Sequence, residues 1–201
     1  MIDDTYKTIE QPSKEILYKD KNSKFFGYAF PVTSDDEVKK IIDQLKKDHH
    51  AARHWCYAWQ IGIENPSYRV NDDGEPSNSA GQPIYGQILS FEVTNILIVV
   101  VRYFGGIKLG VGGLISAYKS TAQMSLEASS IVRKTINHYC MLIFDYKNMN
   151  KVMRVIKARQ LDIIEQNLGL DCRLTLSIRK NKLQEIIQIF EGLYEVQVKM
   201  L

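Results

Sequence analysis

The sequence predicts an α+β protein of two domains, and two patterns carry that prediction. In the C-terminal third, strand-like and helix-like segments alternate in the order βαββαβ. Earlier in the chain, the continuous apolar run Ile96–Val101 lies between two helix-like segments, as expected of a strand buried on both faces. A chain of 201 residues, 45% of them hydrophobic and 24% charged, is long enough for one large or two small domains. We therefore expect one domain at residues 1–135 and a second at 136–201.

Local signals define the first elements in chain order. Two β-like runs, Glu15–Tyr18 and Lys24–Val32, flank a polar turn and predict a hairpin. Ser34 is a favourable N-cap for a helix that runs to about Asp48. The aromatic segment at residues 54–63 predicts the next strand.

Helical patterns flank the apolar strand. Residues 81–91 have the pattern of a helix that precedes it, and residues 114–132 have the pattern of a helix that follows it. Arg133, Lys134 and Asn137 predict a junction between the two domains.

Beyond the junction the elements alternate regularly. This order is that of a ferredoxin-like domain. The expected elements are strand 138–145, helix 148–160, strands 162–168 and 171–178, helix 180–191 and strand 194–200.

Charge and cysteine content limit the classes of protein. Residues 1–135 carry equal numbers of basic and acidic side chains, so the formal net charge of +3 lies in the C-terminal third. The three cysteines, Cys56, Cys140 and Cys172, are odd in number and contain no CxxC pair, which favours a reducing compartment over a disulfide framework. Without an apolar run long enough for a signal peptide or a bilayer span, we expect a cytoplasmic protein with no membrane partner.

Two loops around the apolar strand concentrate the chemistry. The first, Asn71–Pro83, is acidic and rich in Gly, Pro and Ser, and the second, Gly105–Gly113, is rich in glycine. Clustered glycines indicate tight turns or close backbone approaches. These loops are therefore the expected site.

Three interpretations fit the acidic loop. Its carboxylates Asp72, Asp73 and Glu75 have the oxygen ligands that a hard cation such as Mg²⁺ prefers, although the spacing is not that of an EF-hand. The same residues are also ordinary turn formers. We favour a third interpretation, in which the loop pairs with Arg102 or Lys108, and we expect no metal or cofactor.

The glycine-rich loop differs from known nucleotide-binding motifs. It matches neither GxxxxGK[ST] nor GxGxxG in the required frame. A strand that leads through glycines into a helix nevertheless presents free backbone N–H groups, which form an anion site. Close packing of loop and helix is the alternative explanation.

Histidine and cysteine side chains give weaker signals. His50 and His54 have the spacing of a zinc-binding helix, but the expected helix ends near His50 and no HExxH motif is present. Cys56 and His54 fall on one face of a strand, so a Cys–His pair is an open alternative to a buried structural cysteine. We assign no catalytic residue.

The C-terminal domain contains a basic helix. Its cations recur at helical spacing opposite an apolar face, which fits either phosphate contacts or a solvated surface. The candidate nucleic-acid-binding residues are Lys147, Lys151, Arg154 and Lys157.

The central region resembles the Impact family, whose bacterial members are often called YigZ-like. The matching segments are His54–Trp59, Asp72–Ile84 and Val99–Tyr118. The resemblance implies an N-terminal α/β sandwich like domain 2 of ribosomal protein S5, and a C-terminal domain similar to the fifth domain of elongation factor G. It implies that eukaryotic members regulate translation by competing for an activator of the general amino-acid-control kinase. For bacterial members it implies a link to translation or RNA.

We therefore expect a binding protein linked to translation, whose partner is RNA, the ribosome or a ribosome-associated protein. The alternative is an enzyme or binder for a phosphorylated or nucleotide-like small molecule at the two loops, but no nucleophile–base set supports catalysis. The expected binding residues are Asp72, Asp73, Glu75, Ser79, Gly81, Arg102, Tyr103, Gly105, Gly106, Lys108, Gly110, Gly112 and Gly113.

Overall fold

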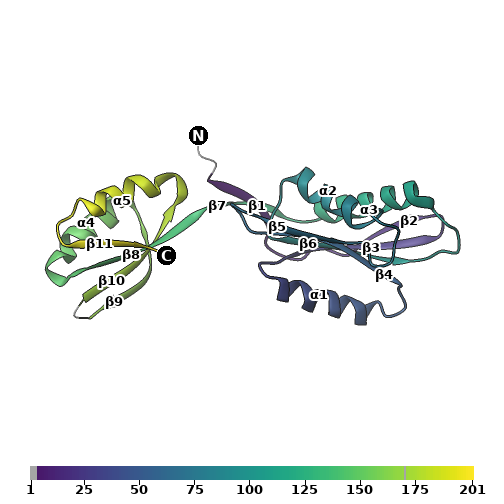
Figure 1. Ribbon diagram of the computed structural model, residues 1–201, viewed down its shortest axis with the longest axis horizontal. Coiled ribbons are helices and arrows are strands. Elements are labelled where there is room, and N and C mark those ends of the chain that lie inside the picture. The colour runs from purple at the N-terminus through teal and green to yellow at the C-terminus, as the bar shows by residue number, and fades with distance from the viewer. Residues whose placement is uncertain (1–3, 170) are drawn as a thin grey trace. The chain divides into compact units, whose positions relative to one another are not determined.

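The computed structural model describes residues 4–169 and 171–201, and it confirms the α+β class. The chain forms two compact units (Figure 1). The larger unit contains Tyr6–Lys134, and the smaller unit contains Thr135–Leu201 together with residues 4 and 5.

The larger unit is built on a five-stranded antiparallel sheet. Its strands lie in the order β2 (Ile16–Asp20), β3 (Ser23–Pro31), β6 (Ile96–Tyr103), β4 (His54–Ile61) and β5 (Ser67–Asn71). Figure 1 shows helices α2 (Gly81–Phe91) and α3 (Gly110–Glu127) on one face of this sheet and α1 (Asp35–Asp48) on the other. The sheet is therefore covered on both faces.

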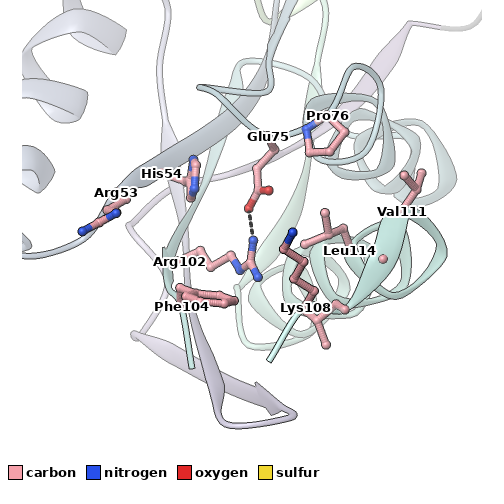
Figure 2. A pocket seen from close by; sticks show the side chains of 11 residues that line it. Arg53, His54, Glu75, Pro76, Arg102, Phe104, Lys108, Val111 and Leu114 are labelled. Carbon is pink, nitrogen blue, oxygen red and sulfur yellow. Dashed lines mark hydrogen bonds and ion pairs between the residues drawn. The ribbon is translucent and has the colours of Figure 1, made fainter. Parts of the chain in front are cut away.

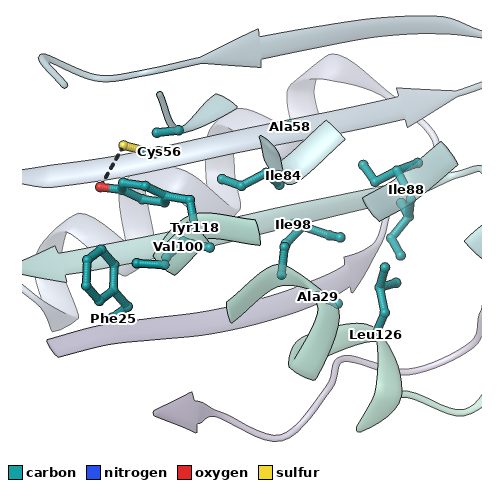
Figure 3. Close-up of a cluster of buried hydrophobic side chains, with 14 of the residues drawn as sticks. Phe25, Ala29, Cys56, Ala58, Ile84, Ile88, Ile98, Val100, Tyr118 and Leu126 are labelled. Carbon is teal, nitrogen blue, oxygen red and sulfur yellow. Dashed lines mark hydrogen bonds between the residues drawn. The ribbon is translucent and has the colours of Figure 1, made fainter. Parts of the chain in front are cut away.

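The central strand β6 is buried on both faces, as its apolar run predicted. Ile96, Ile98 and Val100 pack into the core under α2 and α3, part of which is drawn in Figure 3. The alternate residues Leu97, Val99 and Val101 belong to the core beside α1. Because side chains of a strand alternate between faces, one uninterrupted apolar run supplies both cores.

Helix α1 begins where its cap predicted. The hydroxyl of Ser34 accepts a hydrogen bond from the backbone N–H of Glu37, at 3.4 Å. Asp35, Asp36 and Glu37 occupy the first turn, where the helix dipole favours negative charge.

Three strands were not predicted, and one helix was predicted too long. The sequence analysis missed β1 (Thr5–Ile9), β5 and β7 (Ile131–Thr135). Helix α3 ends at Glu127, and the following residues Ile131 and Val132 belong to β7, which pairs with β1. Apolar spacing alone does not show this, because the partner strand lies at the opposite end of the unit's sequence and β-branched residues favour the strand once it is present.

The smaller unit has the predicted βαββαβ order. Its elements are β8 (Asn137–Asp145), α4 (Met149–Arg159), β9 (Asp162–Leu168), β10 (Asp171–Arg179), α5 (Leu183–Glu191) and β11 (Val196–Met200). The antiparallel sheet has the order β11-β8-β10-β9, and α4 and α5 cover one face of it (Figure 1). This is the ferredoxin-like arrangement.

The start of the described chain is held within the smaller unit. Arg179 donates from Nε and a terminal nitrogen to the two carboxylate oxygens of Asp4, at 2.5 and 3.1 Å. This pairing holds the pKa of Asp4 below its usual value. The backbone carbonyl of Asp4 also accepts the N–H of Ile136.

Within residues 4–169 and 171–201, no helix is both long enough and apolar enough to cross a bilayer.

The three cysteines are free and buried, so we expect them to resist thiol reagents in the folded protein. Burial raises the pKa of the Cys140 thiol to about 11. Only about one molecule in a thousand then carries the reactive thiolate there at pH 8. Labelling with a thiol reagent at pH 8 should modify none of the cysteines before denaturant is added and all of them afterwards. Rapid labelling of the native protein would contradict this assignment.

Candidate functional site

The larger unit has a pocket where β4, β6 and α3 meet, with a volume of about 440 Å³ (Figure 2). Its wall combines cationic and apolar side chains. The lining residues are Arg53, His54, Glu75, Pro76, Arg102, Phe104, Lys108, Leu109, Gly110, Val111 and Leu114.

A buried ion pair forms one wall of this pocket. A terminal nitrogen of Arg102 lies 2.6 Å from Oε1 of Glu75, and the two side chains are 7% and 4% exposed. The predicted pairing of the acidic loop with Arg102 is thus confirmed. Glu75 of the acidic loop and Lys108 of the glycine-rich loop line the same pocket. The guanidinium carbon lies 5.5 Å from the ring centroids of both Phe25 and Phe104. These rings restrict the orientation of the guanidinium.

The two aspartates of the acidic loop hold its shape. Oδ1 of Asp72 accepts the backbone N–H of Ala80 and Gly81, at 3.0 and 2.8 Å. It therefore caps helix α2, which no side chain at Ala80 can cap. Asp73 accepts the backbone N–H of Trp55 at 2.7 Å and thereby ties the loop to β4.

These contacts give the acidic loop a structural explanation in place of a magnesium site. The second oxygen of Asp72 accepts the N–H of Asn78, and Glu75 is directed at Arg102. Across the described residues, no group of three or more His, Cys, Asp or Glu side chains is placed to hold a metal ion.

Glu75 has a second partner, Tyr118 of α3. The tyrosine hydroxyl donates to Oε1 of Glu75 at 2.8 Å, and the sulfur of Cys56 lies 3.3 Å from the same hydroxyl (Figure 3). Burial raises the pKa of both Cys56 and Tyr118. Cys56 is thus a protonated structural thiol.

The possible Cys–His pair is not formed. Nδ1 of His54 lies 2.8 Å from the carbonyl oxygen of Asp73, while the sulfur of Cys56 lies 3.0 Å from that of Asp72. Because a carbonyl only accepts, Nδ1 of His54 carries a hydrogen, and Nε2 is the acceptor in the neutral ring.

The zinc interpretation of the histidines is also not supported by their positions. His49 lies between the hydroxyls of Tyr28 and Tyr103, at 2.6 and 3.0 Å. His50 is exposed, and His54 binds the loop backbone. The predicted binding residue Tyr103 therefore packs on the α1 face of the sheet, opposite Arg102.

The glycine-rich loop is shorter than predicted, because Gly110, Gly112 and Gly113 lie in the first turn of α3. Gly105 packs closely against the backbone of Asn22. A Cβ at this position would lie 2.0 Å from the backbone carbon of Asn22. Gly106 has φ +87, in the region that favours glycine.

Of the other predicted residues, Lys108 and Gly110 line the pocket, whereas Ser79 and Gly81 are structural. The hydroxyl of Ser79 donates to the carbonyl of Pro76 within the loop. A Cβ on Gly81 would lie 2.8 Å from the backbone nitrogen of Asn71.

The sequence analysis missed several lining residues. Arg53 and His54 enter because β4 pairs with β6 in a register that places His54 opposite Arg102. Phe104, Val111 and Leu114 complete the apolar side. The one local indication of these lining residues in the sequence was Arg53, a basic residue just before the aromatic strand.

In the smaller unit, the proposed nucleic-acid-binding residues divide into two groups. Lys147 lies before α4 and pairs with Asp145 and Glu195, at 3.3 and 2.5 Å. The exposed cations of α4 itself lie opposite its buried apolar face. Arg159, in the last turn, pairs with Glu185 at 2.7 Å. The others are Lys151, Arg154 and Lys157, which we call the α4 stripe.

Removing the Tyr118 hydroxyl should weaken the larger unit. Tyr118→Phe leaves the buried Glu75 carboxylate with one donor fewer, and we expect the free energy of unfolding to fall by about 2 kcal/mol. Urea unfolding measures the change. Tyr68→Phe, at a 55% exposed side chain, is the matched control and should change it by less than about 0.5 kcal/mol. Equal effects from both variants would contradict the role assigned to Tyr118.

Comparisons with known proteins agree with this architecture. Residues 21–126 match the model of the Impact N-terminal domain. The IMPACT family member YvyE of Bacillus subtilis is 32% identical over 78% of this chain and 71% of its own. The IMPACT family member YigZ of Escherichia coli is 37% identical over 57% of each chain.

A solved structure extends the match to nearly the whole chain. A crystal structure described as that of a hypothetical protein covers 98% of both chains, at 25% identity and a TM-score of 0.74. The family model and the sequence relatives together place this chain in the Impact family.

Proposed function

We propose that this chain is a cytoplasmic binding protein linked to translation, and that it contacts RNA of the ribosome through the pocket beside Arg102. The observation that carries the proposal is the charge of the pocket wall. Three cationic residues, Arg53, Arg102 and Lys108, line the pocket together with one acidic residue, Glu75.

The carboxylate does not neutralise the wall. Glu75 is held by Arg102 and Tyr118, and within the described chain neither Arg53 nor Lys108 forms an ion pair. Both of these side chains belong to exposed residues. A site with surplus positive charge attracts phosphates, which supply most of the affinity of proteins for nucleic acids.

The pocket also has an apolar component that suits RNA. Phe104 is 52% exposed, and its ring lies next to the Arg102 guanidinium. Proteins that bind single-stranded nucleic acid combine a cationic track with aromatic side chains on which bases stack. Both components are present here.

The link to translation comes from the family. The resemblance to the Impact family implies that its eukaryotic members regulate translation, and membership in that family makes a related role the best-supported function for this chain. We further propose that residues 1–135 and 136–201 act as two domains.

The α4 stripe of the smaller unit offers a second set of phosphate contacts. Lys151, Arg154 and Lys157 are exposed, and within the described chain none of them forms an ion pair. No aromatic side chain interrupts this row, so we expect contacts to phosphates without base readout.

Co-sedimentation with ribosomes and ribosomal RNA across a salt series tests the proposal. The wild-type protein should bind with an affinity that falls as salt rises. Arg53→Ala with Lys108→Ala should weaken binding and reduce the slope of log K against log salt by roughly 0.7 for each lost phosphate contact. Lys151→Ala with Arg154→Ala should act in the same direction.

A charge-matched variant separates the effect of losing contacts at the pocket from the effect of lowering the net charge. Lys40→Ala with Lys47→Ala removes two exposed cations of α1, away from the pocket. This control should leave the slope unchanged. Absence of binding at low salt, or an equal loss in the α1 control, would overturn RNA recognition by this pocket and favour a protein partner.

A further inference from the structure

The Arg102 guanidinium has donors that the folded chain does not use. Its one hydrogen bond to another described residue is the one from a terminal nitrogen to Glu75, although a guanidinium carries five N–H groups. Nε is buried and has no partner. The side chain is 7% exposed and lines the pocket, beside Lys108 in Figure 2. Buried donors are normally satisfied, and a guanidinium that makes one hydrogen bond leaves donors for a further acceptor.

A second set of free donors reaches the same pocket from α3. This helix has 18 residues, its first turn has no side-chain cap, and that turn contains no acidic residue. Gly110 and Val111, at its start, line the pocket. The first N–H groups of a helix lack intrahelical partners and carry the positive end of its dipole. They therefore favour an oxyanion at this position.

The charge of the group is constrained by the cations around it. Lys108 and Arg53 line the pocket, and among the described residues neither has a carboxylate partner. Together with Arg102 and the positive end of the helix dipole, they give the pocket more positive charge than one negative charge would neutralise. A phosphomonoester, with nearly two negative charges near pH 7, matches this surplus.

The rest of the pocket wall indicates what kind of group is attached to the phosphate. Phe104, Val111 and Leu114 give an apolar surface, and Phe104 is 52% exposed. The volume of about 440 Å³ lies in the range of small-molecule sites. A planar base that stacks on an aromatic ring fits such a surface.

We infer that this pocket binds a nucleoside monophosphate group, with the phosphate held by Arg102, Lys108 and the first turn of α3 and the base held against Phe104. The inference rests on the proposed function, because it assigns a ligand chemistry to the same site. The group can be a free nucleotide or the 5′-phosphorylated end of an RNA chain.

Isothermal titration calorimetry with four probes tests this inference. The probes are AMP, adenosine, a 5′-phosphorylated oligoadenylate and the same oligonucleotide with a 5′-hydroxyl. AMP should bind at least tenfold more tightly than adenosine. Tighter binding of the phosphorylated oligonucleotide than of its 5′-hydroxyl form identifies an RNA end as a ligand, and binding of AMP alone identifies a free nucleotide.

Two substitutions locate the site without removing Arg102 from the core. Val111→Glu places a carboxylate in the first turn of α3, where the dipole favours it but a phosphate would be repelled. Val111 is 54% exposed, so the fold should tolerate the change. Val111→Glu and Lys108→Ala should each weaken AMP binding at least tenfold. Ile115→Glu, one turn further along α3 and outside the pocket, is the charge-matched control and should not.

The outcomes separate this inference from the proposed function. No binding of AMP or the phosphorylated oligonucleotide, or equal affinity for AMP and adenosine, overturns the inference even where ribosomal RNA co-sediments. Equal weakening by Val111→Glu and Ile115→Glu also overturns it. Nucleotide binding that depends on Lys108 and Val111, without co-sedimentation of ribosomal RNA, sustains this inference and overturns the proposed function.

Discussion

The larger unit depends on the buried ion pair between Glu75 and Arg102, because this contact joins its central strand to its longest loop. Taking two charges out of water is unfavourable unless their attraction and further hydrogen bonds compensate for the lost hydration. Glu75 obtains that compensation from Arg102 and from the hydroxyl of Tyr118. The Arg102 guanidinium also lies over two phenylalanine rings. Loop, strand and helix α3 are therefore fixed by one set of contacts.

The same contact connects the fold to the proposed site. Glu75 uses one donor of Arg102, a residue that lines the pocket, and the buried Nε has no partner. The first turn of α3 reaches the same cavity without a cap. Few buried donors in a protein lack a partner, and each one that does requires an explanation. The arrangement supports binding of an anion. The nearby Cys56 thiol adds no negative charge, because its raised pKa keeps it protonated.

Much of the fold and part of the site could be predicted from the sequence, wherever the signal is local. Ser34 marks the start of α1, and the apolar run of β6 shows that it is buried on both faces. Pairing between the acidic loop and Arg102 follows from the opposite charges of the loop and of a cation near the end of the apolar strand. Other features depend on distant partners: His54 lies beside Arg102 only through the β4–β6 register, and β7 forms only with β1. Gly110, Gly112 and Gly113 predicted a loop because glycine has a low helix propensity. They lie in the first turn of α3, since tertiary packing overrides that propensity.

A double-mutant cycle on the ion pair tests the central claim most directly. Urea unfolding would be measured for Glu75→Gln, Arg102→Met and the double variant. Each single change should lower the free energy of unfolding by about 3 to 5 kcal/mol, because it leaves a buried group without its partner. The double variant should be more stable than the sum of the two effects predicts, by at least about 2 kcal/mol. Effects that add within about 0.5 kcal/mol would contradict the claim that this pair joins the loop to the sheet.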